Sequence, residues 1–150
     1  MILNLNEDWV MSIETITEKT VDWISISNQK GMDIIKWYLN GEISVITPII
    51  LDKVFNIWVN DTSDNKAPID WVIDGLGVLF GEYIISKSFG KWVIEEDNDE
   101  KHLMILTKNN IKVYPIHSVS KRVNSIDKEI GFFSSIWDVI EIETRLQQIE

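Results

Sequence analysis

The stretch that decides the fold is residues 68–123, which read PIDWVIDGLGVLFGEYIISKSFGKWVIEEDNDEKHLMILTKNNIKVYPIHSVSKRV. Its first part is a long apolar pattern that starts at Pro68 and has the spacing of a helix. Apolar side chains occupy most of the circumference of this predicted central helix. A helix that is apolar on all sides is normally buried, so we expect it to lie deep in the core.

Three glycines, Gly75, Gly77 and Gly81, lie inside the predicted central helix. Glycine weakens a helix interior by up to about 1 kcal/mol relative to alanine, so glycines at these positions need a reason. Gly77 and Gly81 share one face, and we predict that a neighbouring element packs closely against it. A groove that faces a ligand is the alternative interpretation.

A small antiparallel sheet is predicted after the central helix. Lys91–Ile94 and His102–Thr107 read as strands on either side of an acidic turn, Glu95–Glu100. Asn109-Asn110 suits a tight turn into a third strand, Ile111–Tyr114, because asparagine tolerates positive φ. Consecutive strands joined by short turns imply an antiparallel meander.

A first helix is predicted near the N-terminus. Asn6 would cap it, and acidic residues follow in the first turn, where the helix dipole favours them. One face carries residues at three- and four-residue spacing: Trp9, Ile13, Ile16, Thr20 and Trp23. Extended structure over Val21–Ser27 is the alternative, because many residues in this region are β-branched.

Two further helices are predicted before the central one. A break at Asn28–Gly31 separates the first helix from a short helix over Asp33–Asn40, which ends at Gly41. The next start signal is Thr47, which places a capping hydroxyl directly before a proline. The polar run Asn60–Ala67 then predicts a loop within one domain.

Together these patterns predict one α+β domain over residues 1–150. Helices, among them the buried central helix, occupy about residues 1–88, and a meander of three or slightly more antiparallel strands occupies about residues 91–115. An amphipathic C-terminal helix completes the core over about residues 131–148. Its predicted apolar stripe consists of Phe132, Ile136, Val139, Leu146 and Ile149.

Composition limits the classes of protein to which the chain can belong. The net charge of −10 and the pI near 4.6 disfavour nucleic acids and anionic membranes as ligands, because both bind clustered Lys and Arg. The chain contains no cysteine, which excludes disulfides, thiol nucleophiles and cysteine-based zinc sites. We find no secretory signal and no apolar run of about twenty residues, so we expect a cytoplasmic protein.

Several motifs of the central stretch follow one another in a fixed order. A glycine-spaced helix, Gly75–Glu82, precedes a strand led by Trp92 and a turn at Asp97, and Pro115 is followed by Val119-Ser120-Lys121-Arg122. In this order the motifs resemble a family of small bacterial domains whose activity is uncharacterised, and the acidic chain is similar to immunity proteins. The resemblance implies a fold and transfers no catalytic residue, because the family has none established.

No metal site or cofactor is predicted. His102 and His117 lie on different predicted elements and do not form a helical ligand pair. A weak site formed by His102 with Asp97 or Asp99 is the alternative, although a lone surface histidine is the favoured interpretation of His102. The acidic run also lacks the glycine and the glutamate that a calcium-binding loop requires.

Catalytic motifs are incomplete in this sequence. His117 precedes Ser118, but no Gly-x-Ser-x-Gly elbow is present, and the glycines lack the spacing of a dinucleotide-binding loop. By elimination, a pocket between the central helix and the sheet would use Asp74, Glu82 and His117. The basic pair that ends the stretch, Lys121-Arg122, would bind an anion, form a salt bridge or stabilise a helix end.

The function predicted from these observations is non-catalytic binding of a basic protein. An acidic surface accelerates association with a basic partner, and many bacterial toxins are basic nucleases. The chain is therefore predicted to be an immunity or antitoxin-like protein that neutralises a toxin domain by direct binding. The residues predicted to contact the partner are Glu95, Glu96, Asp97, Asp99 and Glu100. The other interpretation of this acidic run is a solvated hairpin tip that discourages edge pairing. The alternative is a small-ligand-binding or hydrolytic domain with a pocket between the central helix and the sheet.

Overall fold

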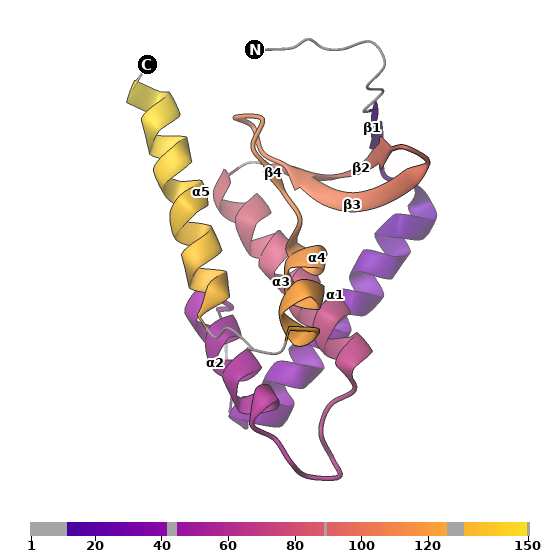
Figure 1. The fold of residues 1–150 in the computed structure, drawn as a ribbon, viewed down its shortest axis with the longest axis vertical. Coiled ribbons are helices and arrows are strands. Elements are labelled where there is room, and N and C mark those ends of the chain that lie inside the picture. The colour runs from indigo at the N-terminus through magenta and orange to yellow at the C-terminus, as the bar shows by residue number, and fades with distance from the viewer. Residues whose placement is uncertain (1–11, 42–44, 89, 126–130, 150) are drawn as a thin grey trace.

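The computed structural model describes residues 12–41, 45–88, 90–125 and 131–149. The helices are α1 (Glu18–Leu39), α2 (Pro48–Val59), α3 (Ile69–Ser88), α4 (Pro115–Val123) and α5 (Phe132–Ile149), and the strands are β1 (Ser12–Thr15), β2 (Lys91–Asp97), β3 (Glu100–Leu106) and β4 (Lys112–Val113). The strands form one antiparallel sheet in the order β1-β2-β3-β4, which lies across one end of the helices (Figure 1). The predicted α+β class is confirmed.

The N-terminal region differs from the prediction. Ser12–Thr15 does not belong to a helix and forms the edge strand β1, because it pairs with β2 through contacts such as Ile13 with Glu95. Helix α1 starts after Thr17, whose hydroxyl accepts a hydrogen bond of 3.2 Å from the backbone N–H of Thr20. The predicted cap, Asn6, lies outside the described residues.

Helix α1 also continues through the predicted break at Asn28–Gly31. It ends at Leu39, and Asn40 adopts a left-handed conformation with φ of 53° one residue before the predicted stop. The break was predicted from local signals, but Gly31 lies where α1 meets α3. A Cβ on Gly31 would be 2.5 Å from the carbonyl oxygen of Gly75, so this glycine permits a close helix contact.

The predicted start of α2, the loop before α3 and the burial of α3 are confirmed. Thr47 caps α2 by accepting a hydrogen bond of 3.3 Å from Ile50 N–H, and Asn60–Ala67 forms a loop. The central helix α3 is deeply buried, with Val72 and Phe80 at 0% exposure. Even so, no helix in the described part of the chain is both long enough and apolar enough to cross a membrane.

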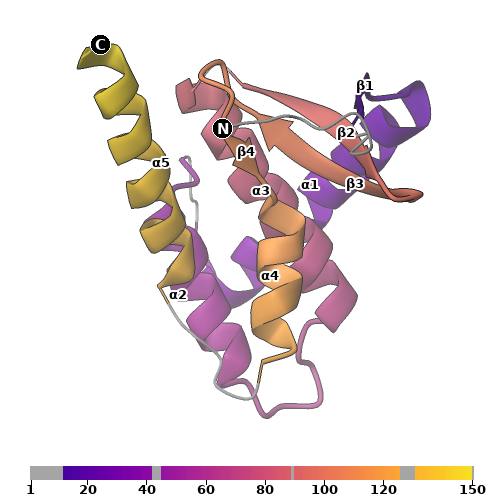
Figure 2. The same cartoon turned by 45° about the horizontal axis from the view of Figure 1, so that its top comes forward.

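The glycines of α3 mark close contacts, as predicted. A Cβ on Gly77 would lie 2.7 Å from the Cα of Ile116 in α4, and a Cβ on Gly81 would collide with the ring of Trp92 in β2. Protein atoms therefore occupy the glycine face, which corrects the alternative interpretation of a ligand-facing groove. These contacts bring α4 and the sheet against the central helix (Figures 1 and 2).

The sheet differs from the prediction in its turns. Strand β2 extends to Asp97, so the acidic turn contains only Asn98 and Asp99, which have φ of 49° and 67°. Asn110 has φ of 64° in the predicted second turn. Pro115 does not merely end the third strand but opens α4, a helix that the sequence interpretation missed, although proline is common at a first helical position.

The core surrounds α3 and takes buried side chains from every helix and from the sheet, and its aromatic cluster lies where α2, α3 and α5 meet. Phe55 of α2 packs edge-on against Phe132 at a centroid distance of 5.0 Å, and Phe80 of α3 packs edge-on against Phe133 at 5.2 Å. The predicted stripe of α5 is only partly buried: Phe132 is 1% exposed, but Val139 and Leu146 are 60% and 53% exposed. The reason is that α5 extends beyond α2 along its C-terminal half (Figure 1).

Tertiary hydrogen bonds to one carboxylate fix the start of α5. The carboxylate of Asp52 in α2 accepts hydrogen bonds from the backbone N–H groups of Phe133, at 2.9 Å, and Ser134, at 3.2 Å. Asp52→Ala is expected to lower the free energy of unfolding by about 1 to 2 kcal/mol, because α5 loses an acidic cap. Urea denaturation monitored by tryptophan fluorescence measures this loss. Asp64→Ala in the exposed loop is the control, and equal stabilities of the two variants would contradict the capping role.

Candidate functional site

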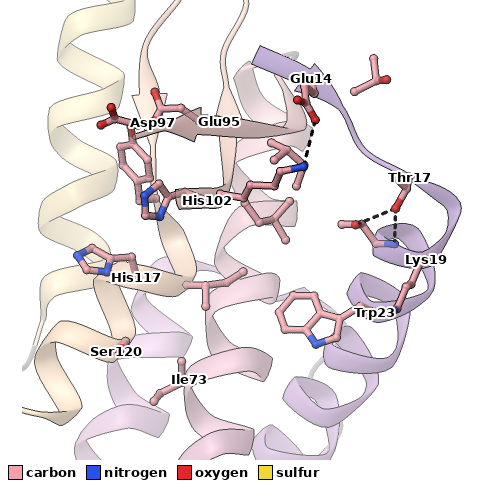
Figure 3. Close-up of a pocket in the computed structure, with 17 residues that line it drawn as sticks. Glu14, Thr17, Lys19, Trp23, Ile73, Glu95, Asp97, His102, His117 and Ser120 are labelled. Atoms are coloured by element: carbon pink, nitrogen blue, oxygen red, sulfur yellow. Dashed lines mark hydrogen bonds and ion pairs between the residues drawn. The ribbon is translucent and has the colours of Figure 1, made fainter. Parts of the chain in front are cut away.

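A cleft of about 990 Å³ lies between the sheet and the first turns of α1 and α4 (Figure 3). Strands β2 and β3 contribute one wall, and the opposite wall comes from α1 with Trp23 and from α4 with His117 and Ser120. Its volume lies at the upper end of the range for ligand-binding clefts. The cleft is therefore large enough for a small ligand or for a segment of another protein.

The cleft exists because β4 is short. It pairs only with Ile105 and Leu106 of β3, so among the described residues the first half of β3 has no strand on that side. The chain then turns into α4 at Pro115, away from the sheet (Figure 2). His102 and Leu103 precede the part of β3 that pairs with β4. On that side they therefore border the cleft and not a strand.

A buried carboxylate, that of Glu95, lines this cleft. Glu95 is 4% exposed, and its two oxygens accept hydrogen bonds from the Lys112 ammonium group at 2.8 Å and from the Tyr114 hydroxyl at 2.7 Å. Burial alone would raise the pKa of Glu95, but these hydrogen bonds outweigh burial and hold its pKa below the usual 4.5. Glu95 is therefore ionised at neutral pH and is held inside the fold.

Tyr114 is the neutral member of this network. Burial, together with its hydrogen bond to Glu95, raises the pKa of Tyr114 to about 12. Its hydroxyl is therefore protonated at neutral pH and donates to the carboxylate. The charge of Asp97, which also lines the cleft, acts on the pKa of Tyr114 in the same direction.

The end of the β2–β3 hairpin carries the other predicted contact residues. Lys101 lies between two carboxylates, with its ammonium nitrogen 3.9 Å from both Glu14 and Glu96. The side chain of Glu100 is 76% exposed, and Asp99 is exposed in the turn. The five predicted residues thus divide between the exposed hairpin end, with Glu96, Asp99 and Glu100, and the cleft, with Glu95 and Asp97.

The catalytic candidates do not converge. Of the three, His117 lines the cleft, whereas Asp74 and Glu82 do not. Glu82 accepts a hydrogen bond of 3.2 Å from the indole N–H of Trp92. Burial raises the pKa of Asp74, although the charge of Lys30 opposes this effect. The sequence analysis did not identify Glu95 as the buried acid of the cleft. The available signal was the two-residue period of a strand, which places Glu95 on the same face of β2 as the apolar Val93.

The other charged residues that the sequence singled out, His102, Lys121 and Arg122, occupy positions that the fold itself explains. The side chain of His102 is 45% exposed and lies 3.5 Å from Glu100, as expected for a surface histidine. In the part of the chain that the structure describes, no group of three or more His, Asp or Glu side chains is placed to hold a metal ion. Lys121 and Arg122 lie in the last turn of α4, where the helix dipole favours cations, and the Arg122 guanidinium lies 5.0 Å from the ring centre of Phe132.

Comparison with known proteins gives one match. A family model described as a domain of unknown function (DUF3806) matches residues 51–133, which is more than half of the chain. The match agrees with the resemblance to an uncharacterised family of small domains. No curated protein and no solved structure matches the chain.

Proposed function

The chain belongs to the DUF3806 family of domains of unknown function, and we propose that it is a non-catalytic acidic protein that binds a basic protein partner. The observation that supports this function is the charge at the end of the hairpin. The carboxylates gathered there are Glu14, Glu96, Asp97, Asp99 and Glu100, and Lys101 is the lysine among them. A local negative potential of this kind attracts a basic surface and increases the association rate constant.

In its specific form, this function is that of a cytoplasmic bacterial immunity or antitoxin-like protein that neutralises a nuclease-type toxin by direct binding. A nuclease domain carries clustered Lys and Arg to bind nucleic acid, so it presents the complementary charge. The net charge of −10 is consistent with such a partner. In this scheme Glu95 supports the hairpin from inside, while its acidic neighbours meet the partner.

Neutralising the hairpin end is expected to slow complex formation. The variant Glu96→Gln/Asp99→Asn/Glu100→Gln should associate on the order of tenfold more slowly with a basic nuclease-type toxin domain, measured at low salt by stopped flow. At high salt the difference from the unsubstituted protein should shrink, because salt screens exposed charges.

The control removes the same net charge elsewhere, with Asp64→Asn, Asp138→Asn and Glu143→Gln at exposed positions. Equal slowing of both triple variants would assign the effect to net charge alone. Absence of any salt-sensitive complex would contradict binding of a basic protein. For the toxin-neutralising form, co-expression with the toxin should protect cells less well when the hairpin variant replaces the unsubstituted protein.

The second candidate function is small-ligand binding, and the cleft of about 990 Å³ favours it. A hydrolytic version has less support, because Asp74 and Glu82 lie outside the cleft that His117 lines. Ligand binding and protein binding at this end of the molecule are compatible, since the exposed hairpin end borders the cleft.

A further inference from the structure

The cleft beneath the hairpin continues directly into the acidic hairpin end, because Asp97 belongs to both. We propose that this cleft anchors an arginine side chain of the basic partner, with the guanidinium at Asp97. The anchor rests on the proposed function and adds to it a defined recognition site.

Asp97 offers a carboxylate for a cation. Within the described residues Asp97 has no ion-pair partner, whereas the neighbouring acid Glu95 is engaged by Lys112 and Tyr114. Lys101 is held between Glu14 and Glu96. The charge that remains open to a ligand at this end of the cleft is therefore negative.

The second cation of the cleft lies elsewhere. Lys19 belongs to α1, on the wall opposite the strands that carry Asp97 (Figure 3). An anion would therefore find its partner on the α1 wall, far from the sheet end described above. At the sheet end of the cleft, the carboxylate of Asp97 is the charge open to a ligand. A cation is therefore the ligand that this end favours.

Flat side chains near Asp97 select the kind of cation. Tyr114 and His102 line the cleft together with Asp97, and the His102 ring lies on the same side of the cleft as Asp97 (Figure 3). A guanidinium stacks on such rings and pairs with a carboxylate through two parallel hydrogen bonds, whereas an ammonium group acts as a point charge. Trp23 and Leu103 provide apolar surface farther along the cleft for the residues that flank the arginine.

The test uses two uncharged-backbone probes that differ only in the cation. N-acetyl-arginine amide and N-acetyl-citrulline amide have the same shape, but citrulline replaces the guanidinium with a neutral urea. Titration of the full chain, followed by ¹⁵N–¹H NMR, should show the arginine probe binding on the order of tenfold more tightly than the citrulline probe. The shifts should gather at Asp97, His102 and Tyr114.

Matched substitutions locate the site. Asp97→Asn should abolish the preference for arginine over citrulline. Asp99→Asn, which makes the same chemical change two residues away at an exposed position outside the cleft, should keep it. Equal binding of the two probes to the unsubstituted protein, or an unchanged preference in Asp97→Asn, would overturn the anchor.

Measurements with the partner separate the anchor from the proposed function. If the salt-sensitive complex forms with the same dissociation constant when Asp97→Asn is present, the anchor is overturned and binding of a basic protein stands. If the arginine probe binds selectively but no basic protein forms a complex, the proposed function fails while the cation site remains. Preferential binding of inorganic phosphate at the Asp97 end would also overturn the anchor.

Discussion

Replacing Gly75 with valine is expected to lower the free energy of unfolding by about 3 kcal/mol, because overpacking at a backbone contact cannot be relieved by side-chain rotation. A Cβ on Gly75 would lie 2.6 Å from the backbone nitrogen of Gly31 and 2.7 Å from its Cα. These atoms belong to α1, so the two helices would have to move apart. Valine brings two further methyl groups into the same space.

Separating α1 from α3 should also alter the cleft. Trp23 stands two turns before Gly31 on α1, and Ile73 stands two residues before Gly75 on α3, and both line the cleft. Urea denaturation gives the stability, and the NMR spectrum of the Trp23 indole reports the cleft. Gly41→Ala is the control, because among the described residues a Cβ there would meet only the Leu39 carbonyl, at 3.7 Å. A Gly75→Val variant as stable as this control would show that the helix contact is not tight.

Replacing Glu95 with alanine is expected to lower the free energy of unfolding by about 3 kcal/mol at neutral pH, since one partner of a buried charge pair is removed. The side chain of Glu95 is 6% exposed, and that of Lys112 is 35% exposed. Lys112 can therefore regain some water, which keeps the loss at the lower end for such pairs. Tyr114 loses its acceptor in the same substitution.

The effect of Glu95→Ala should depend on pH with a definite sign. The pKa of Glu95 is lower in the folded protein than its usual 4.5, so its contribution is complete above the unfolded pKa and is lost as the pH falls through the folded pKa. The difference in stability between the unsubstituted protein and Glu95→Ala should therefore be constant near neutrality and narrow below about pH 4.5. Glu96→Ala, on the adjacent exposed residue, is the control. A difference that widens in acid would contradict the assigned network.

The sequence predicted those features of the fold that depend on neighbouring residues. Thr47 and the proline after it define a helix start from local chemistry alone. The break at Gly31 was wrong because that glycine serves a contact with Gly75, which lies far away in the chain. Strand β1 was missed because it has four residues, and only its pairing with β2 makes it a strand.

The candidate site was only partly predictable for the same reason. The acidic character of the hairpin is visible in the sequence, but the alternation that turns Glu95 inward depends on how far β2 extends. Helix α4 has nine residues, and its first residue, Pro115, also suits the end of a strand. A pocket beside the sheet was predicted only as an alternative, and most of its lining could not be foreseen, since Trp23, Asp97 and His117 come from three distant segments.

The walls of the cleft also differ in whether the family match includes them. The family match over residues 51–133 includes the hairpin and α4, whereas β1 and α1 lie outside it. One wall, with Trp23, is thus encoded apart from the segment that defines the family. In the proposed binding role, substitutions in the first turns of that helix would alter the surface offered to a partner while the segment shared with the family keeps its sequence.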